Sequence, residues 1–297
     1  MRSILFYIGP VPIRAYGLML WIAIVVGLWR TVRAARRTDI KSEHVIDLAI
    51  YAVLGGVLSA HLTSILLDLR YYLSDPSAIL TLWSGILSPS GGLRGLSFHG
   101  GLIGAIGVAY LYTRRKKIPF LEMVDLLAPG LAIAYAITRV GCLLNGCCYG
   151  IPTHLPWAVR FHEDGGLTPP SHPTQIYGSL ANILIYLGLV LIARKRRFTG
   201  QVFYSYLVMY SVYRFFLEFL RKGVTAEVAF AGLTQAQLVS MFALLILLSV
   251  LIIKYRRTSA PAIRNPSRPR TGSRRRRGKS AIRNMRGSHV RAGRLPR

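Results

Sequence analysis

Acidic residues are scarce in this chain, and so is cysteine. The 297 residues contain 11 Asp and Glu against 38 Lys and Arg, which gives a formal net charge of +27. The three cysteines, Cys142, Cys147 and Cys148, lie in one short stretch, which excludes a disulfide framework. Because no further ligand stands nearby at a familiar zinc spacing, we expect no metal and no other cofactor.

The chain also shows no internal repeat of the kind that builds many transporters, and Met1–Pro12 lacks the basic start, apolar core and cleavage site of a secretory signal. A cleaved signal peptide is therefore not expected. What the chain has in excess is apolar sequence: 52% of its residues are hydrophobic, and the mean hydropathy is +0.40. Several runs reach the roughly 20 residues that a helix needs to cross a bilayer. This composition predicts an integral membrane protein.

Seven apolar segments alternate with polar loops, which predicts an all-α, polytopic protein with seven transmembrane helices. The predicted spans cover about residues 16–29, 45–67, 97 to the basic cluster at 114–117, 119 into the stretch 138–150, 173 to the basic cluster at 194–197, 201–220 and 235–253. Basic clusters follow the first, third, fifth and seventh spans, whereas the loops at about 68–96 and 151–172 are nearly neutral. By the positive-inside rule the N-terminus is outside, the C-terminus is cytoplasmic, and these loops are periplasmic.

Residues 256–297 contain many arginines, no acidic residue and too few apolar residues to build a core. They are predicted to form a basic, disordered cytoplasmic tail. Such a tail can bind anionic lipid or RNA. We prefer the plainer interpretation, a solvated topology anchor with no specific nucleic-acid partner.

Arg139 lies inside the fourth apolar segment, where a charged side chain costs about 2.5–3.5 kcal/mol on insertion scales. The residues that follow, from Asn145 to Gly150, form a polar turn rich in glycine. Irregular backbone at membrane depth survives only when protein covers it or when it lines a wet cavity. The stretch 138–150 therefore predicts the floor of a site for an anionic headgroup.

The sixth segment carries Tyr210, Arg214, Glu218 and Arg221 at steps of four, four and three, so they share one helical face. Glu218 can pair with either arginine. One interpretation is a structural ion-pair stripe between helices. Because one arginine is left in excess, the other interpretation is an anion site.

Topology predicts that five polar residues meet near the outer leaflet: Tyr16, His99, Arg139, Arg214 and Arg221. A channel or pump would distribute such residues through the whole bilayer, so the pattern favours a one-sided site. His99 precedes Gly100-Gly101, which permits a close approach of a headgroup, although a scaffolding histidine is the alternative. Tyr16 is either a hydrogen-bond donor to the ligand or an interfacial anchor.

Five blocks of sequence together are similar to those of the bacterial prolipoprotein diacylglyceryl transferases. They occur in the family's order over about residues 1–255. The blocks are Tyr16-Gly17-Leu18-Met19, Ser97-Phe98-His99-Gly100-Gly101-Leu102-Ile103-Gly104, Arg139-Val140-Gly141-Cys142 with Asn145-Gly146-Cys147-Cys148-Tyr149-Gly150, His172-Pro173-Thr174-Gln175-Ile176-Tyr177, and Tyr210 with Arg214-Phe215, Glu218 and Arg221.

The resemblance implies that residues 1–255 form a seven-helix transmembrane catalytic domain in the bacterial cytoplasmic (inner) membrane, with its site toward the periplasmic leaflet. The implied reaction transfers the diacylglyceryl group from phosphatidylglycerol to the lipobox cysteine of a preprolipoprotein signal peptide. The products are a thioether and glycerol-1-phosphate. The implied partners are therefore this phospholipid, the signal peptide and membrane lipid.

By motif position, the resemblance assigns catalysis to His99, Arg139 and Arg214. It assigns substrate binding to Arg139 as well, and to six further residues: Tyr16, Asn145, Gly150, Tyr210, Glu218 and Arg221. The chain departs from the family where Cys142 replaces a frequent Asn, Cys147 an acid, Gly178 a Glu and His61 an Arg.

The residues suit that chemistry. A thiol of pKa about 8.5 must lose its proton to attack, histidine is a suitable base, and arginines can stabilise a phosphate leaving group. Two other classes stay open at this point. One is a lipid-binding transporter or flippase, and the other is a membrane scaffold that binds RNA or ribosomes through the basic tail.

Overall fold

A computed structural model describes residues 4–8, 11–75, 77, 96–163, 166–222, 228–230 and 232–259. Long helices make up most of this part, as predicted. They are α1 (Ala15–Ala35), α2 (Ser42–Leu67), α5 (Phe98–Arg115), α6 (Phe120–Asn145), α7 (Thr174–Arg194), α8 (Gln201–Glu218) and α9 (Gln235–Ser259), joined by the short α3 (Leu69–Ser74). The tail beyond residue 259 and most of the loop at 68–96 lie outside the described residues.

Three small antiparallel hairpins were not expected from an all-α prediction. They pair β1 (Ile4–Ile8) with β2 (Val11–Arg14), β3 (His162–Glu163) with β4 (Gly166–Leu167), and β5 (Val228–Phe230) with β6 (Leu233–Thr234). Each is too short to produce a clear alternating pattern in the sequence. The hairpins occupy segments that the sequence marked only as loops.

Within the described residues, five helices are long and apolar enough to cross a membrane: α1, α2, α6, α7 and α9. α5 and α8 lie at two further predicted spans, and each is 18 residues long. They are less apolar because α5 is rich in glycine and ends on arginines, while α8 carries tyrosines, Arg214 and Glu218. The described part therefore has the character of a membrane protein, and its two less apolar long helices, α5 and α8, both hold predicted site residues.

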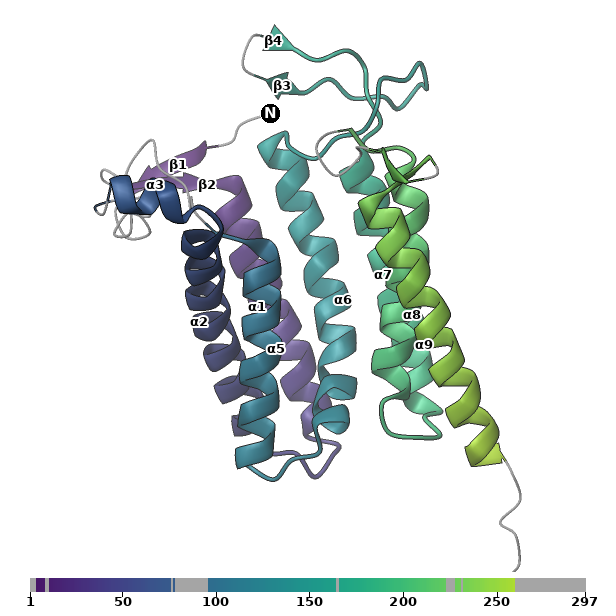
Figure 1. Cartoon of the computed structure of the whole chain (residues 1–297). Coiled ribbons are helices and arrows are strands. Elements are labelled where there is room, and N and C mark those ends of the chain that lie inside the picture. The colour runs from purple at the N-terminus through teal and green to yellow at the C-terminus, as the bar shows by residue number, and fades with distance from the viewer. Residues whose placement is uncertain are drawn as a thin grey trace, which may run out of the picture. The chain divides into compact units, whose positions relative to one another are not determined.

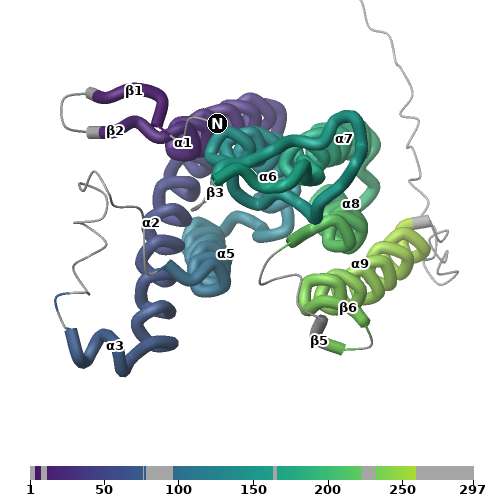
Figure 2. The backbone as a smooth tube through the Cα atoms, turned by 90° about the horizontal axis from the view of Figure 1, so that it is seen from above, coloured from purple at the N-terminus to yellow at the C-terminus, as the bar shows by residue number. Residues whose placement is uncertain are grey.

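α6 is the helix around which the others pack. It contacts α1 on one side and α7 and α8 on the other, while α5 packs mainly against α2, and α9 against α8. Figure 1 shows these helices running alongside one another, and Figure 2 shows α6 between α1 and α7 in the view along the bundle. One apolar cluster joins α6, α7 and α8 through Ala128, Ala132, Ile185, Leu189 and Val202.

The two ends of the bundle differ. β1, β2, α3, β3 and β4 lie at the end where α6 finishes and α7 begins (Figure 1). The opposite end has the short basic connections between α1 and α2, α5 and α6, and α7 and α8. There Asp125 accepts hydrogen bonds from the backbone N–H groups of Gly200 at 2.7 Å and Phe203 at 2.8 Å, and it pairs with Arg196. A buried carboxylate needs such partners, so Asp125 holds the connection between α7 and α8 against α6.

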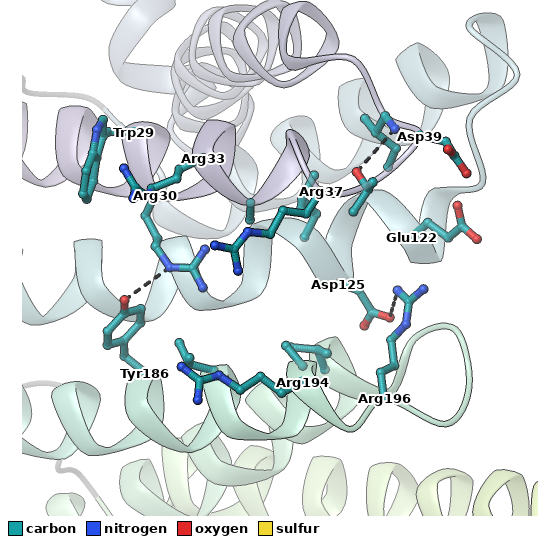
Figure 3. Close-up of a pocket in the computed structure, with 17 residues that line it drawn as sticks. Trp29, Arg30, Arg33, Arg37, Asp39, Glu122, Asp125, Tyr186, Arg194 and Arg196 are labelled. Atoms are coloured by element: carbon teal, nitrogen blue, oxygen red, sulfur yellow. Dashed lines mark hydrogen bonds and ion pairs between the residues drawn. The ribbon is translucent and has the colours of Figure 1, made fainter.

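A cavity of about 770 Å³ opens at this basic end, between α1, α6 and α7. Figure 3 shows arginine side chains from α1 and from the end of α7 around it. Arg30 donates a hydrogen bond to the Tyr186 hydroxyl at 3.2 Å. This cavity contains none of the residues that the sequence predicts for the site, because those lie on other turns of the helices.

Candidate active site

Arg139 is buried near the end of α6, with 8% of its surface exposed. Its Nη2 donates a hydrogen bond to the hydroxyl of Tyr135, and its guanidinium carbon lies 4.9 Å from the centre of the Tyr135 ring. Its buried Nε donates to no acceptor in the part of the chain that the structure describes. No carboxylate forms an ion pair with Arg139 among those residues either. The guanidinium group is therefore a buried positive charge with donor capacity to spare.

Tyrosines surround this arginine. The rings of Tyr135 and Tyr210 lie 5.7 Å apart, and those of Tyr210 and Tyr213 lie 5.8 Å apart. The Tyr135 phenol accepts a hydrogen bond from Arg139 without adding a negative charge, so it orients this guanidinium group and leaves its positive charge unneutralised.

Gly178 on α7 makes room for Arg139. A Cβ added to Gly178 would lie 2.6 Å from the Tyr213 hydroxyl and 3.3 Å from Arg139 Nε. The guanidinium group can thus lie directly against the backbone of α7.

The turn after α6 is held by α7. Gly146 ends α6 in the left-handed conformation with φ 74°, and Cys148 also has a positive φ of 64°. A non-glycine residue in this region is uncommon and needs support from its surroundings. Thr174 Oγ1 donates a hydrogen bond to the Cys148 carbonyl at 2.6 Å, and Gln175 Nε2 donates one to the Cys147 carbonyl at 2.7 Å. The first turn of α7 therefore fixes the backbone of both cysteines.

Gly150 connects this turn to the end of α8. It forms an antiparallel bridge with Arg221, and the N–H of Ile151 donates to the Leu220 carbonyl at 3.0 Å. A Cβ on Gly150 would meet the Leu220 carbonyl oxygen, His172 and Thr174. The structure thus gives Gly150 a close-packing role that brings Arg221 beside the cysteine turn.

Arg214 and Glu218 form an ion pair one helical turn apart on α8. Glu218 is buried, with 2% of its surface exposed, and Arg221 lies just beyond the end of the helix. Of the two pairings that the sequence left open for Glu218, the one with Arg214 forms. Arg221 has a buried Nε without a hydrogen-bond acceptor in the described part. Arg221, like Arg139, therefore has a buried donor that no described residue accepts.

Two of the arginines act on the cysteine turn. The pKa of the Cys148 thiol is lowered by hydrogen bonds with Cys142 and Cys147 and by the positive charges of Arg221 and Arg139. Arg139 and Arg221 are therefore near enough to the cysteine turn for their charges to act on it, whereas Arg214 forms its ion pair with Glu218.

Tyr16, His99 and Asn145 lie at the edges of this arrangement. Tyr16 packs against α6, where a Cβ on Gly141 would lie 3.5 Å from its Cα and ring. Asn145 is exposed at the last position of α6. His99 is exposed in the first turn of α5 and contacts the Phe98 ring at 5.7 Å. No hydrogen bond or ion pair joins His99 to the three arginines among the described residues, so the structure does not bring it into direct contact with them.

Sequence reasoning missed the residues that position the site. Tyr135, Tyr213, Thr174 and Gln175 were not selected, although each contacts Arg139 or the cysteine turn. Tyr135 could have been found, because it precedes Arg139 by four residues and shares its helical face. Thr174 and Gln175 were seen only as part of a motif, since their partners lie more than 25 residues away in the chain.

Comparison with known proteins shows the family of the chain. Residues 3–253 match the family described as prolipoprotein diacylglyceryl transferase. The chain belongs to this family. A relative from Clostridium tetani is 31% identical over 249 residues, covering 83% of this chain and 95% of its own length. A relative from Nitratidesulfovibrio vulgaris is 35% identical over 240 residues, covering 79% and 86%.

A third relative, from Geobacter sulfurreducens, is 32% identical over 263 residues, which is 87% of this chain and 97% of the relative. All three carry the name phosphatidylglycerol–prolipoprotein diacylglyceryl transferase. The match to the prolipoprotein diacylglyceryl transferase family includes α1 to α8 and most of α9, so every residue of the site lies within it.

Proposed function

We propose that this chain transfers the diacylglyceryl group of phosphatidylglycerol to the lipobox cysteine thiol of a prolipoprotein, forming a thioether and releasing glycerol-1-phosphate. Membership of the family supports the reaction class. The observation that carries the site is Arg139, a buried guanidinium group with no carboxylate partner in the described residues. A buried cation of this kind is stabilised by an anionic ligand, and the lipid supplies a phosphodiester.

The attacking group is the lipobox thiol, which is mostly protonated at neutral pH. In the proposed mechanism His99 accepts its proton, and the sulfur attacks the glycerol carbon that carries the phosphate ester. The carbon–sulfur bond forms as the carbon–oxygen bond breaks. General base catalysis of this kind contributes typically 10²–10⁴-fold to the rate. The proposal requires the substrate to reach both His99 and the arginines, which make no direct contact with each other in the described residues.

The leaving group gains negative charge on its phosphate oxygens. Arg139 and Arg214 are proposed to bind those oxygens and to stabilise the charge in a site from which water is largely excluded. Arg221 extends the positive surface toward the cysteine turn. The ion pair with Glu218 fixes the direction of Arg214 and reduces its charge, which makes Arg139 the strongest single anion ligand of the set.

The remaining predicted residues are proposed to bind the substrate or to shape its site. Tyr16 and Tyr210 offer hydroxyls, Asn145 offers an amide, and Gly150 permits the close packing beside Arg221. We also propose that all seven long helices cross the cytoplasmic membrane. The basic ends of α1, α5, α7 and α9 are assigned to the cytoplasm, and the site to the periplasmic leaflet. Residues 1–255 then form the catalytic domain, followed by the tail at 256–297.

The test is direct transfer by the purified chain. It is incubated with phosphatidylglycerol and a lipobox peptide, and we expect glycerol-1-phosphate and a matching mass gain on the peptide cysteine. Arg139→Ala is expected to lower kcat/KM by about 100-fold or more, since it removes a charged group aimed at the leaving phosphate. Arg194→Ala, at the basic end of the bundle, serves as the matched arginine control and keeps full activity. Near-normal transfer by Arg139→Ala would show that its assigned role is wrong.

A further inference from the structure

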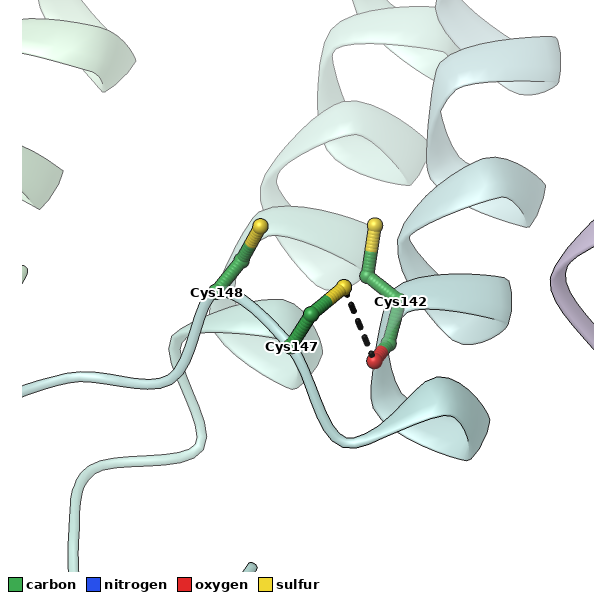
Figure 4. Close-up of side chains that lie close together, drawn as sticks. All are labelled: Cys142, Cys147 and Cys148. Atoms are coloured by element: carbon green, nitrogen blue, oxygen red, sulfur yellow. Dashed lines mark hydrogen bonds between the residues drawn. The ribbon is translucent and has the colours of Figure 1, made fainter. Parts of the chain in front are cut away.

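All three cysteines of the chain come together beside Arg139 and Arg221. Cys142 belongs to the last turns of α6, while Cys147 and Cys148 belong to the turn that follows. Their sulfur atoms all lie within 4.8 Å of one another. Figure 4 shows the three side chains extending to the same side of the turn. Such a set of thiols offers three soft ligands to one metal ion.

The spacing suits a single ion. A zinc–thiolate bond is about 2.3 Å long, so three sulfurs around one zinc ion lie roughly 4 Å apart. The observed spacing needs to close only slightly to reach that geometry. The backbone of two ligands is already fixed, because Thr174 and Gln175 bind the carbonyls of Cys148 and Cys147. This preorganisation lowers the cost of gathering the ligands.

We propose that Cys142, Cys147 and Cys148 form a three-thiolate site for one thiophilic divalent ion such as Zn²⁺, whose fourth coordination position takes the lipobox thiol of the substrate. The second part rests on the proposed function. Zinc sites with three protein ligands keep one position for water or substrate, and a thiol bound to the ion is deprotonated. The site thus supplies a thiolate at the place where the reaction needs one.

The charges of the neighbourhood are compatible with this assignment. Three thiolates and one divalent cation leave a net charge of about −1 on the complex. Gly150 is the second residue after Cys148, and its antiparallel bridge brings the backbone of Arg221 alongside it. Arg139 lies one helical turn before Cys142 on α6. Both arginines can therefore offset part of the charge of the complex.

The proposed transfer at this site involves no change of oxidation state. The lipobox thiol loses a proton to His99 or to water as it binds, and its sulfur then forms the bond to the glycerol carbon. The carbon–oxygen bond to phosphate breaks, glycerol-1-phosphate leaves, and the thioether, a weaker ligand, leaves the metal. The ion keeps its oxidation state throughout.

The first test measures metal binding by the full-length chain in detergent, reduced and without oxygen. Co²⁺ is the probe, because thiolate ligands give it charge-transfer absorption. We expect one ion per chain and protection of all three thiols from a thiol reagent, and no other cysteine adds background. Cys147→Ser and Cys142→Ser are each expected to weaken binding by about tenfold or more. His154→Gln, an exposed loop histidine, is the control for adventitious binding and leaves the affinity unchanged.

The second test adds a lipobox peptide to the Co²⁺-loaded chain. The cysteine peptide is expected to change the spectrum to that of a four-thiolate site, and the matching serine peptide is not. Absence of stoichiometric Co²⁺ binding, or binding that survives all three Cys→Ser changes, overturns the site. Full transfer by the triple Cys→Ser variant overturns its role while the proposed function stands. Absence of transfer by the metal-loaded wild-type chain overturns the proposed function itself.

Discussion

Arg139 shows how the neighbours of a single residue determine the charge that it can offer to a ligand. The sequence places a charge within an apolar segment, and tyrosines rather than carboxylates enclose it. Because phenols do not neutralise a guanidinium group, the charge stays available for an anionic ligand. The nearby Arg214 illustrates the opposite case, since Glu218 on the same helix pairs with it.

Gly178 is the residue most closely tied to the position of Arg139. Gly178→Ala is expected to reduce kcat/KM by about tenfold to 100-fold, because its Cβ would displace the Tyr213 hydroxyl and press on the guanidinium group. Gly107→Ala on α5 is the matched control, since a Cβ there meets nothing within 4 Å. The measurement compares the rates of transfer by the two purified variants. Equal rates would show that the packing of Gly178 against Arg139 does not affect transfer.

Thr174 supports the cysteine turn through one hydroxyl. Thr174→Val keeps the shape of the side chain but leaves the Cys148 carbonyl without its donor, which costs about 1–3 kcal/mol at a buried site. We expect a lower thermal unfolding temperature and slower transfer. Thr258→Val, exposed near the end of α9, is the control with unchanged stability. An unfolding temperature equal to that of the wild type would show that the hydrogen bond adds little.

At the scale of elements, α6 contributes both to the candidate site and to the packing of the connection between α7 and α8. Its C-terminal end carries Arg139 and the cysteine turn, while its first turns carry Asp125, which holds the connection between α7 and α8. The ends lie on opposite sides of the bundle (Figure 1). Substitutions in the first turns of α6 are therefore expected to change stability, and substitutions at its C-terminal end to change the rate of transfer.

Asp125→Asn tests that separation. The amide would turn one oxygen acceptor into an N–H donor that faces the backbone N–H groups of Gly200 or Phe203, so we expect a loss of about 1–3 kcal/mol in stability. Transfer per folded molecule should stay near normal. Glu122→Gln, one turn earlier on α6, is the control. A large loss of activity without a loss of stability would place Asp125 in a different role.

At the scale of the whole molecule, the distribution of charge predicts how the chain lies in the membrane. The basic connections at one end of the bundle and the hairpins at the other match the alternation expected of an odd number of spans. A fluorescent protein fused after residue 259 is expected to fluoresce, whereas a phosphatase that folds only in the periplasm is expected to be inactive there. The reverse pattern would invert the proposed orientation.

The tail is expected to be dispensable for the reaction. Removing residues 258–297 takes away part of the positive charge but no residue of the proposed site. Transfer measured on the truncated chain in lipid should therefore stay within about twofold of the full-length chain, because surface charge affects attraction to anionic lipid more than chemistry. Loss of all activity would favour a scaffold function for the tail.

Hydropathy and charge in the sequence were sufficient to locate every long helix of the described part. The predicted starts near residues 97, 119, 173, 201 and 235 lie within one or two residues of the observed ones, because apolar runs and basic clusters are local signals. Arg139, Arg214 and Arg221 were also identified from the sequence, since a charge in an apolar run stands out by itself.

Only the tertiary structure decided which side chains meet. The pairing of Glu218 with Arg214, the fit of Arg139 against Gly178, the bonds from α7 to the cysteine turn and the gathering of three thiols all depend on helices distant in the chain. Periodicity shows which face of a helix is polar, but not the neighbour that this face will contact. That choice follows from packing between helices, where small residues and single hydrogen bonds determine how closely two backbones approach.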